Sequence, residues 1–351
     1  MFPSSASPRQ LDVTIFSSSW KDRLILSSKL DGVKAVDLRV PVSVLNLAWH
    51  RLAWPPVELL AGAAFDVTHS LHPLLLPARD AAQVITIHDL NFLAHPERTR
   101  AEIRRDYPVL TRAHAHRADA IIVPSRFTAA EVERRLGVNA DRIAVCPPGA
   151  PDWTPRRACP DAGYVLFVGT LEPRKNVGTL LDAYERLLAR RAMPELVLAG
   201  QATAESGLWL DRIGRAPLAG HVRHIGYVDP SARRALYEGA RVLVQPSFEE
   251  GFGLPVLEAM TIGAPVVAAD RGALPEVLDG AGLLVDPLQA AALASGLERM
   301  LDDAPFAALC AARGVQRARD FRWSDTAARV YRAYQLAIDR RAEERSSAHR
   351  D

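Results

Sequence analysis

Short apolar runs alternate with helix-like stretches along the 351-residue chain. Runs that are nearly all apolar are typical of strands buried on both faces, as in a parallel sheet covered by helices. The first half contains such runs at Leu11–Phe16, Val33–Val40, Phe65–Thr68, Val84–His88, Ala120–Pro124 and Arg142–Cys146. The second half contains them at Tyr164–Val168, Glu195–Ala199, Val222–Ile225, Arg241–Gln245, Val266–Ala269 and Leu283–Asp286. The alternation predicts an α/β fold built on parallel sheets.

A proline-rich segment separates the two sets of runs. Pro147–Pro151 is followed closely by Pro155 and Pro160, and this density of proline ends both helices and strands. We therefore predict two doubly wound, Rossmann-like domains that face each other across a cleft, over residues 1–155 and 156–322. For residues 323–351 we expect a helix that packs back on the first domain, followed by a charged tail.

Composition excludes several classes of function. Charged residues make up 24% of the chain and the net charge is +2, which gives no basis for nucleic-acid binding. The three cysteines, Cys146, Cys159 and Cys310, lack the spacing of a disulfide framework or a zinc site. The first ten residues are polar, and no apolar run is long enough to span a membrane. We expect a cytoplasmic protein, at most peripheral at the inner face of the membrane.

The segment Gln245–Met260, QPSFEEGFGLPVLEAM, combines a glycine-containing loop with several carboxylates. A strand leads into a glycine-containing loop, and Pro255 suits the first turn of a helix, whose free N–H groups could bind phosphate. Glu250 lies in the loop and Glu258 about one turn into the helix. Two carboxylates beside an anion site favour sugar hydroxyls as further ligands. Alternatively, Glu258 only complements the helix dipole, and Glu249 and Glu250 are solvated loop charges.

A second segment combines Arg174 and Lys175 after the run that ends near Gly169. Only four of the 43 basic residues are lysines, so the position of this one is informative. A planar guanidinium and a compact ammonium could together clamp a diphosphate, although a surface pair near a helix start is the alternative. Neither segment matches the G-x-G-x-x-G fingerprint or a P-loop.

Together these segments resemble the donor-binding domain of the retaining glycosyltransferases of family 4, which have the GT-B fold. The matching segments are Gly169–Asn176, Ile225–Val228, Pro246–Met260, Gly263–Val267 and Leu274–Val277. Glu250 and Glu258 stand at the E-x7-E spacing. The first half matches more loosely, at Thr86–Leu90, Ala118–Ser125 and Pro147–Gly149. The overall pattern is most similar to bacterial mannosyltransferases of surface polysaccharide assembly.

The resemblance implies roles for individual residues. Arg174 and Lys175 would bind the donor pyrophosphate and stabilise the charge that develops as it leaves. Glu250 would contact the donor sugar, Glu258 the ribose, and His88 the sugar from the first domain; a buried structural histidine is the alternative for His88. The other donor-binding candidates are Gly169, Thr170, Gly226, Tyr227, Val228, Gly251, Phe252, Gly253 and Leu254. Ser125 and Gly149 are weaker candidates, for which turn formation is the alternative.

The implied reaction moves a hexose, with mannose favoured, from a nucleotide diphosphate sugar, with GDP-mannose as the expected donor. Front-face attack would retain the anomeric configuration. The sequence contains no D-x-D motif, so we expect neither a metal nor a cofactor. The acceptor would be a saccharide or a lipid-linked saccharide. The basic stretch 98–117 could contact anionic lipids, or it could be a solvated helix face.

The first half departs from the family pattern at its beginning. The family's first strand and Gly-rich loop would precede Leu11–Phe16, and residues 1–60 contain a single glycine, Gly32. We therefore expect either a start upstream of residue 1 or a shortened first domain. Two other functions stay open: a non-catalytic or degenerate sugar-nucleotide-binding protein or partner subunit, and a GT-B nucleotide-sugar epimerase.

Overall fold

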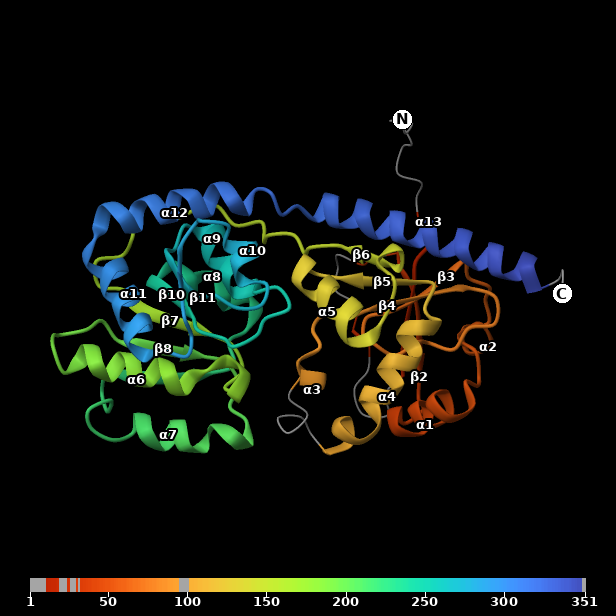
Figure 1. Ribbon diagram of the computed structural model, residues 1–351, viewed down its shortest axis with the longest axis horizontal. Helices are drawn as coiled ribbons and strands as arrows, with labels where there is room; N and C mark the ends of the chain where they lie inside the picture. Colours follow the sequence, from red (N-terminus) through yellow and green to blue (C-terminus); the bar gives the residue numbers. More distant parts are fainter. Residues whose placement is uncertain (1–10, 19–23, 26–29, 31, 95–100, 349–351) are drawn as a thin grey trace.

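The computed structural model describes residues 11–18, 24–25, 30, 32–94 and 101–348. Its two halves lie side by side along the long axis, and the last helix extends across the first half (Figure 1). Each of the apolar runs predicted to be a strand overlaps a strand among these residues. The expectation of a missing strand and loop before Leu11 lies outside the described residues.

The second half is built on one parallel sheet with the strand order β12-β11-β10-β7-β8-β9. The strands are β7 (Tyr164–Val168), β8 (Leu196–Ala199), β9 (Val222–Gly226), β10 (Ala240–Gln245), β11 (Val266–Ala269) and β12 (Leu283–Val285). The order of the strands reverses between β7 and β10. At such a point the following loops diverge and leave a crevice at the carboxyl ends of the strands.

Helices cover both faces of this sheet (Figure 1). They are α6 (Val177–Leu188), α7 (Gly207–Ile213), α8 (Pro230–Glu238), α9 (Leu254–Ile262), α10 (Leu274–Leu278), α11 (Ala290–Asp302) and α12 (Ala304–Ala318). Alternate residues of β7 enter two separate cores. Phe167 packs with residues of α6 and α11, whereas Leu166 packs with residues of α9 and α10. The apolar character of β7 on both faces is therefore explained by burial between two helical layers.

The described strands of the first half form two parallel sheets. β1 (Thr14–Ser18) pairs with β2 (Lys34–Leu38). The other sheet has the order β3 (Val67–Ser70), β4 (Ala82–Thr86), β5 (Ala120–Val123) and β6 (Ile143–Val145). The helices are α1 (Val42–Leu52), α2 (Val57–Ala61), α3 (Asn91–Ala94), α4 (Ala101–Arg117) and α5 (Arg126–Leu136). Every residue of β4 and β5 is buried.

The C-terminal helix α13 (Trp323–Ala348) returns from the second half to the first. Its Ala333 and Ala337 are buried against Val84 and Ile122 of the four-stranded sheet. Arg340 donates to the carbonyl of Asp119 at 2.7 Å. Small residues let the helix backbone approach the sheet closely, and the last helix thereby completes the core of the first half.

None of the helices in the part of the chain that the structure describes is both long enough and apolar enough to span a bilayer.

Candidate functional site

A tight turn after β7 places Arg174 and Lys175 beside the loop that follows β10. The turn is a short 3-10 helix, Pro173–Lys175, and it ends at Asn176 in the left-handed conformation (φ 57°). The Asn176 amide donates to the carbonyl of Pro246 at 3.0 Å and to that of Pro287 at 2.8 Å. Asparagine tolerates this conformation better than most residues do. Asn176 therefore ties the Lys175 turn to the loop that follows β10.

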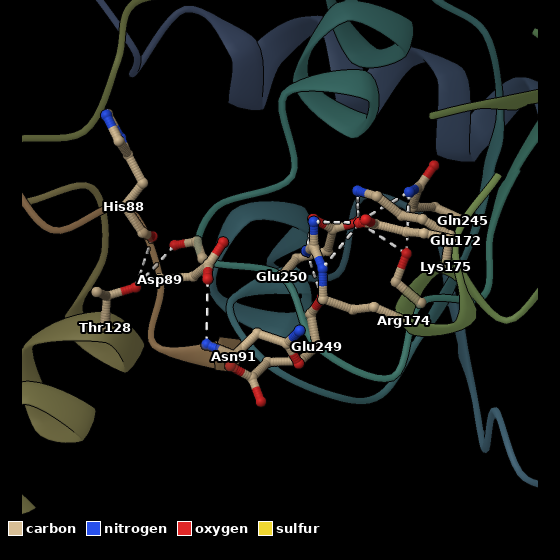
Figure 2. A network of polar contacts seen from close by, with 12 residues as sticks. His88, Asp89, Asn91, Thr128, Glu172, Arg174, Lys175, Gln245, Glu249 and Glu250 are labelled. Carbon is tan, nitrogen blue, oxygen red and sulfur yellow. Dashed lines mark hydrogen bonds and ion pairs between the residues drawn. The ribbon is translucent and has the colours of Figure 1, made fainter. Parts of the chain in front are cut away.

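Glu250 lies at the centre of this cluster (Figure 2). Its Oε1 accepts hydrogen bonds from Lys175 Nζ at 2.6 Å, from Ser247 Oγ at 2.7 Å and from Gln245 Nε2 at 2.9 Å. Its Oε2 accepts from Arg174 Nη1 at 3.2 Å. Glu250 is only 6% exposed and Lys175 only 8% exposed. Such a buried ion pair is sustained because the remaining lone pairs also find donors.

Arg174 bridges two carboxylates. Its Nε and Nη2 donate to Glu172 Oε1 at 3.2 and 2.8 Å, while Nη1 donates both to Glu250 and to the carbonyl of Glu249 at 3.0 Å. Most of its donors are therefore engaged within the protein. Burial would lower the pKa of Arg174, but the charges of Glu250, Asp89 and Glu172 outweigh it and raise that pKa.

Glu249 and Glu250 are adjacent in sequence and differ electrostatically. Burial would raise the pKa of Glu250, but Lys175 and Arg174 outweigh burial and hold that pKa below its ordinary value. Burial and the nearby charge of Asp89 raise the pKa of Glu249. Glu250 is thus an ionised carboxylate that neutralises part of the cationic pair, and the alternative of a solvated loop charge is wrong for it.

Glu258 lies on α9 on the other side of the glycine-containing loop. Its Oε1 is 3.1 Å from Arg233 Nη2 of α8. Burial raises the pKa of Glu258, although Tyr237 and Arg233 oppose this effect. Tyr227, which follows Gly226 at the end of β9, is 72% exposed. The structure therefore buries Glu258 beside the Arg233 guanidinium and leaves the Tyr227 side chain exposed.

The glycine-containing loop is held tightly on both sides. A Cβ atom at Gly251 would overlap the carbonyl oxygen of His88, and one at Gly253, whose φ is 101°, would lie 2.6 Å from Leu274 Cδ2. Phe252 is buried and its ring meets that of Phe321 edge-on at 5.5 Å. Leu254 begins α9 and is about half exposed. Glycine at 251 and 253 thus lets the loop pack closely against His88 and Leu274. Phe252 anchors the loop to the core.

The structure brings the backbone of His88, but not its ring, to this loop. The ring is exposed, its Nε2 lies 3.2 Å from the carbonyl of Leu71, and it points away from Arg174 and Lys175 (Figure 2). The alternative of a buried structural histidine is therefore wrong. Thr170, also predicted at the donor site, is exposed, and Gly169 lies against the aliphatic stem of Lys175.

Ser125 and Gly149 have structural contacts of different kinds. Ser125 caps α5, where its Oγ accepts from the N–H of Thr128 at 3.0 Å and donates to the carbonyl of Gly251 at 2.7 Å. Gly149 is packed against Trp323, and a Cβ atom there would lie 2.5 Å from the Trp323 nitrogen. Ser125 thus contacts the glycine-containing loop. Gly149 packs against Trp323 at the start of α13, where the chain passes between the halves.

Several residues of the site were not identified from the sequence. Gln245 and Ser247 bind Glu250, Glu172 binds Arg174, and Arg233 binds Glu258. Gln245 and Ser247 stand inside the segment singled out above, but no spacing rule marks them. Arg233 lies in a separate helix with several arginines nearby, so only the tertiary contact distinguishes it.

The basic stretch 98–117 is described only in its last part. Residues 98–100 lie outside the described residues, and the side chains of 101–106 are not described either. Arg112 Nη2 donates to the carbonyl of Arg135 at 2.7 Å, and His116 Nε2 lies 2.8 Å from that of Leu136. Both side chains therefore bind the C-terminal end of α5. As for a metal, the described residues contain no group of three His, Cys, Asp or Glu side chains arranged to hold one.

Family models match both halves of the chain. The model described as Glycosyltransferase Family 4 matches residues 6–152, and the model described as Glycosyl transferases group 1 matches residues 162–303. The O-antigen chain mannosyltransferase B of Escherichia coli is 34% identical over 274 residues, which cover 74% of this chain and 72% of that protein.

Two further comparisons agree with these matches. A D-inositol 3-phosphate glycosyltransferase of Corynebacterium efficiens is 29% identical over 283 residues, which cover 75% of this chain and 66% of that protein. The solved structure of sucrose-phosphate synthase from Thermosynechococcus elongatus has a TM-score of 0.77 and 23% identity, and the match covers 93% of this chain and 89% of that one.

Proposed function

Because the chain belongs to glycosyltransferase family 4 and has the GT-B fold, we propose that it transfers mannose from a nucleotide diphosphate sugar, with GDP-mannose favoured, to a saccharide or lipid-linked acceptor. That it is a glycosyltransferase follows from the family. The choice of mannose is supported by the name of the E. coli relative. The two alternatives, an epimerase and a non-catalytic binder, are not favoured by the relatives, which are named as transferases.

One observation carries the choice of a diphosphate donor: Glu250 holds Arg174 and Lys175 together where the strand order reverses. This position is where open α/β sheets bind ligands. An ammonium has three donors, and Lys175 directs one of them to Glu250, so it can also bind a phosphate oxygen without leaving the carboxylate. The start of α9 faces the same loop and adds backbone N–H groups.

The proposed reaction proceeds with retention. The bond between the anomeric carbon and the β-phosphate oxygen breaks, and the acceptor hydroxyl attacks from the face that the phosphate leaves. The departing phosphate oxygen takes the proton of that hydroxyl. Lys175 and Arg174 stabilise the charge that develops on the diphosphate, which is the main requirement of an oxocarbenium-like transition state. We propose that no metal takes part, since two cationic side chains already face the diphosphate position.

Calorimetric titration of GDP, UDP and ADP tests the donor site. Lys175→Ala should weaken binding of the preferred diphosphate by roughly 1.5–3 kcal/mol, because one charge-assisted hydrogen bond is lost. Lys34→Ala is the matched control, since Lys34 is an exposed lysine paired with Asp12 at 3.0 Å. Equal weakening in both variants, or no binding of any diphosphate by the wild type, would contradict the proposal.

The stereochemistry is tested on the product. Incubation with GDP-mannose and a mannose-terminated oligosaccharide should give an α-linked product, which the one-bond C1–H1 coupling of the added mannose in an NMR spectrum identifies. A β-linked product would contradict the front-face mechanism.

A further inference from the structure

The N-terminus of α5 in the first half is bound by a carboxylate of the second half. The N–H of Arg126 donates to Glu276 Oε1 at 3.1 Å, and the N–H of Phe127 donates to Glu276 Oε2 at 3.2 Å. The first N–H groups of a helix have no partner within the helix, and its dipole favours a negative charge there. Glu276 is therefore held by the main chain of α5 at both of its oxygens.

The same end of α5 also holds the glycine-containing loop. Ser125 Oγ and Thr128 Oγ1 both donate to the carbonyl of Gly251, at 2.7 and 3.1 Å. Both side chains are buried. Thr128 Oγ1 also lies 3.5 Å from the carbonyl of His88, as Figure 2 shows. One helix end thus connects the loop after β10 with His88, two residues after the end of β4.

On the side of the second half, Glu276 is linked to Glu250 through a short segment. Glu276 lies on α10, and the N–H of Ala273, just before that helix, donates to the carbonyl of Glu250 at 2.9 Å. Gly272 packs on the same carbonyl group, since a Cβ atom there would lie 2.8 Å from the Glu250 carbonyl oxygen. Glu276 and the main chain of Glu250 are therefore joined through a short segment of the second half.

We propose that Glu276 is a positioning residue: its contact with the α5 N-terminus holds the two halves in the arrangement that reaction requires. We call the two hydrogen bonds from Arg126 N–H and Phe127 N–H to Glu276 the α5 latch. The proposal rests on the proposed function, because it assigns the reaction to the space between the His88 strand end and the cation cluster. The Arg126 side chain contributes little, since it is 80% exposed and its ion pair with Glu276 is 3.4 Å long.

Two substitutions break the latch from opposite sides. Glu276→Ala removes the acceptor. Arg126→Pro removes one donor while keeping the helix, because proline is well accepted at the first helical position. Ser125 before it is extended (φ −151°, ψ 161°), which suits a residue that precedes proline. Arg126→Ala is the matched control, since it retains the N–H group.

We expect kcat for sugar transfer to fall roughly 10- to 100-fold in Glu276→Ala and Arg126→Pro, as small misplacements of reacting groups do. In Glu276→Gln, which keeps one acceptor oxygen, kcat should fall less than in Glu276→Ala. The GDP dissociation constant should change by less than about threefold in every variant, because Arg174, Lys175 and Glu258 are untouched. Arg126→Ala should turn over within about twofold of the wild type.

Small-angle scattering without nucleotide supplies a readout that does not depend on the reaction. Glu276→Ala and Arg126→Pro should have a larger radius of gyration than the wild type and Arg126→Ala. Unchanged scattering and unchanged kcat in both latch variants overturn the proposal. A loss of GDP affinity in the latch variants as large as their loss of kcat also overturns the proposal. An effect of Arg126→Ala on kcat equal to that of Arg126→Pro overturns it as well. If the scattering difference is present but the wild type binds no diphosphate, the proposed function fails and the latch stands.

Discussion

At the scale of single residues, the adjacent pair Glu249 and Glu250 shows how much one position changes a carboxylate. Glu250 lies between Lys175 and Arg174, whereas Glu249 lies near Asp89. For Glu250, the two cations outweigh burial and lower the pKa of the carboxyl group. For Glu249, burial and the like charge of Asp89 both raise the pKa. The two residues should therefore respond oppositely when their charge is removed.

We expect Glu250→Gln to destabilise the protein at pH 7 by roughly 3 kcal/mol, because two buried cations lose their counter-charge. The pKa of Glu250 lies below the ordinary value of 4.5, so its contribution is present above pH 4.5 and is lost as the pH falls through the lowered pKa. Urea unfolding at pH 7 measures the difference.

Glu249→Gln is the matched control for this prediction. The pKa of Glu249 is raised above 4.5, so its favourable contribution is present below pH 4.5 and is lost as the pH rises through that pKa. At pH 7 the substitution should leave stability unchanged or increase it. Equal destabilisation by both substitutions would show that the charges of Arg174 and Lys175 do not govern Glu250.

At the scale of elements, the docking of α13 on the first half depends on a histidine. His69 of β3 contacts Tyr334 of α13 through Nδ1 (2.7 Å to the hydroxyl) and Thr86 of β4 through Nε2 (2.8 Å to Oγ1). Burial, with a smaller effect of His88, lowers the pKa of His69 to about 4. The neutral ring is therefore the form that joins the helix to the sheet.

The free energy of unfolding should accordingly decrease as the pH is lowered from 6.5, the ordinary histidine pKa, to about 4. The folded pKa is below the unfolded one, so the contribution is complete above pH 6.5 and is lost progressively below it, by up to about 3 kcal/mol. Thermal unfolding across this range should show the slope for the wild type and a smaller slope for His69→Gln. His221→Gln, at an exposed position, should behave as the wild type does. The same slope in His69→Gln and the wild type would contradict the assignment.

At the scale of the whole molecule, the chain crosses between the halves twice, and the two crossings touch. The N–H of Ala150 donates to the carbonyl of Phe321 at 2.9 Å, and Thr326 Oγ1 donates to that of Pro147 at 2.6 Å. Gly149 lies between them against Trp323. These contacts fix where α13 leaves the second half and reaches the first.

Gly149→Ala should destabilise the protein by about 1–3 kcal/mol, because the new Cβ would lie 2.5 Å from the backbone nitrogen of Trp323, which cannot rotate away. Gly207→Ala is the matched control, since Gly207 has a helical backbone (φ −52°) and no atom lies within 4 Å of the position that a Cβ would take there. That variant should be unchanged or up to about 1 kcal/mol more stable. Urea unfolding of both measures the contrast, and equal stability of the two variants would contradict the packing role of Gly149.

Much of the fold and part of the candidate site could be predicted from neighbouring residues alone. The strands follow from apolar runs, because burial on both faces leaves a continuous local signal. The turn with Arg174 and Lys175 and the start of α9 follow from glycine, proline and asparagine, which act on the backbone where they stand. These features depend on residues a few positions apart.

The partners of these residues could be decided only by the tertiary structure. Lys175 and Glu250 are 75 positions apart, and Arg126 and Glu276 are 150 apart. Whether the His88 ring faces the cation cluster, and whether Gly149 forms a turn or a packing contact, depends on how the two halves dock. The sequence by itself therefore determined the elements and the chemical groups at their ends, since local patterning controls both. Which of those groups meet was decided by the docking of surfaces distant in the chain, which leaves no periodic signal.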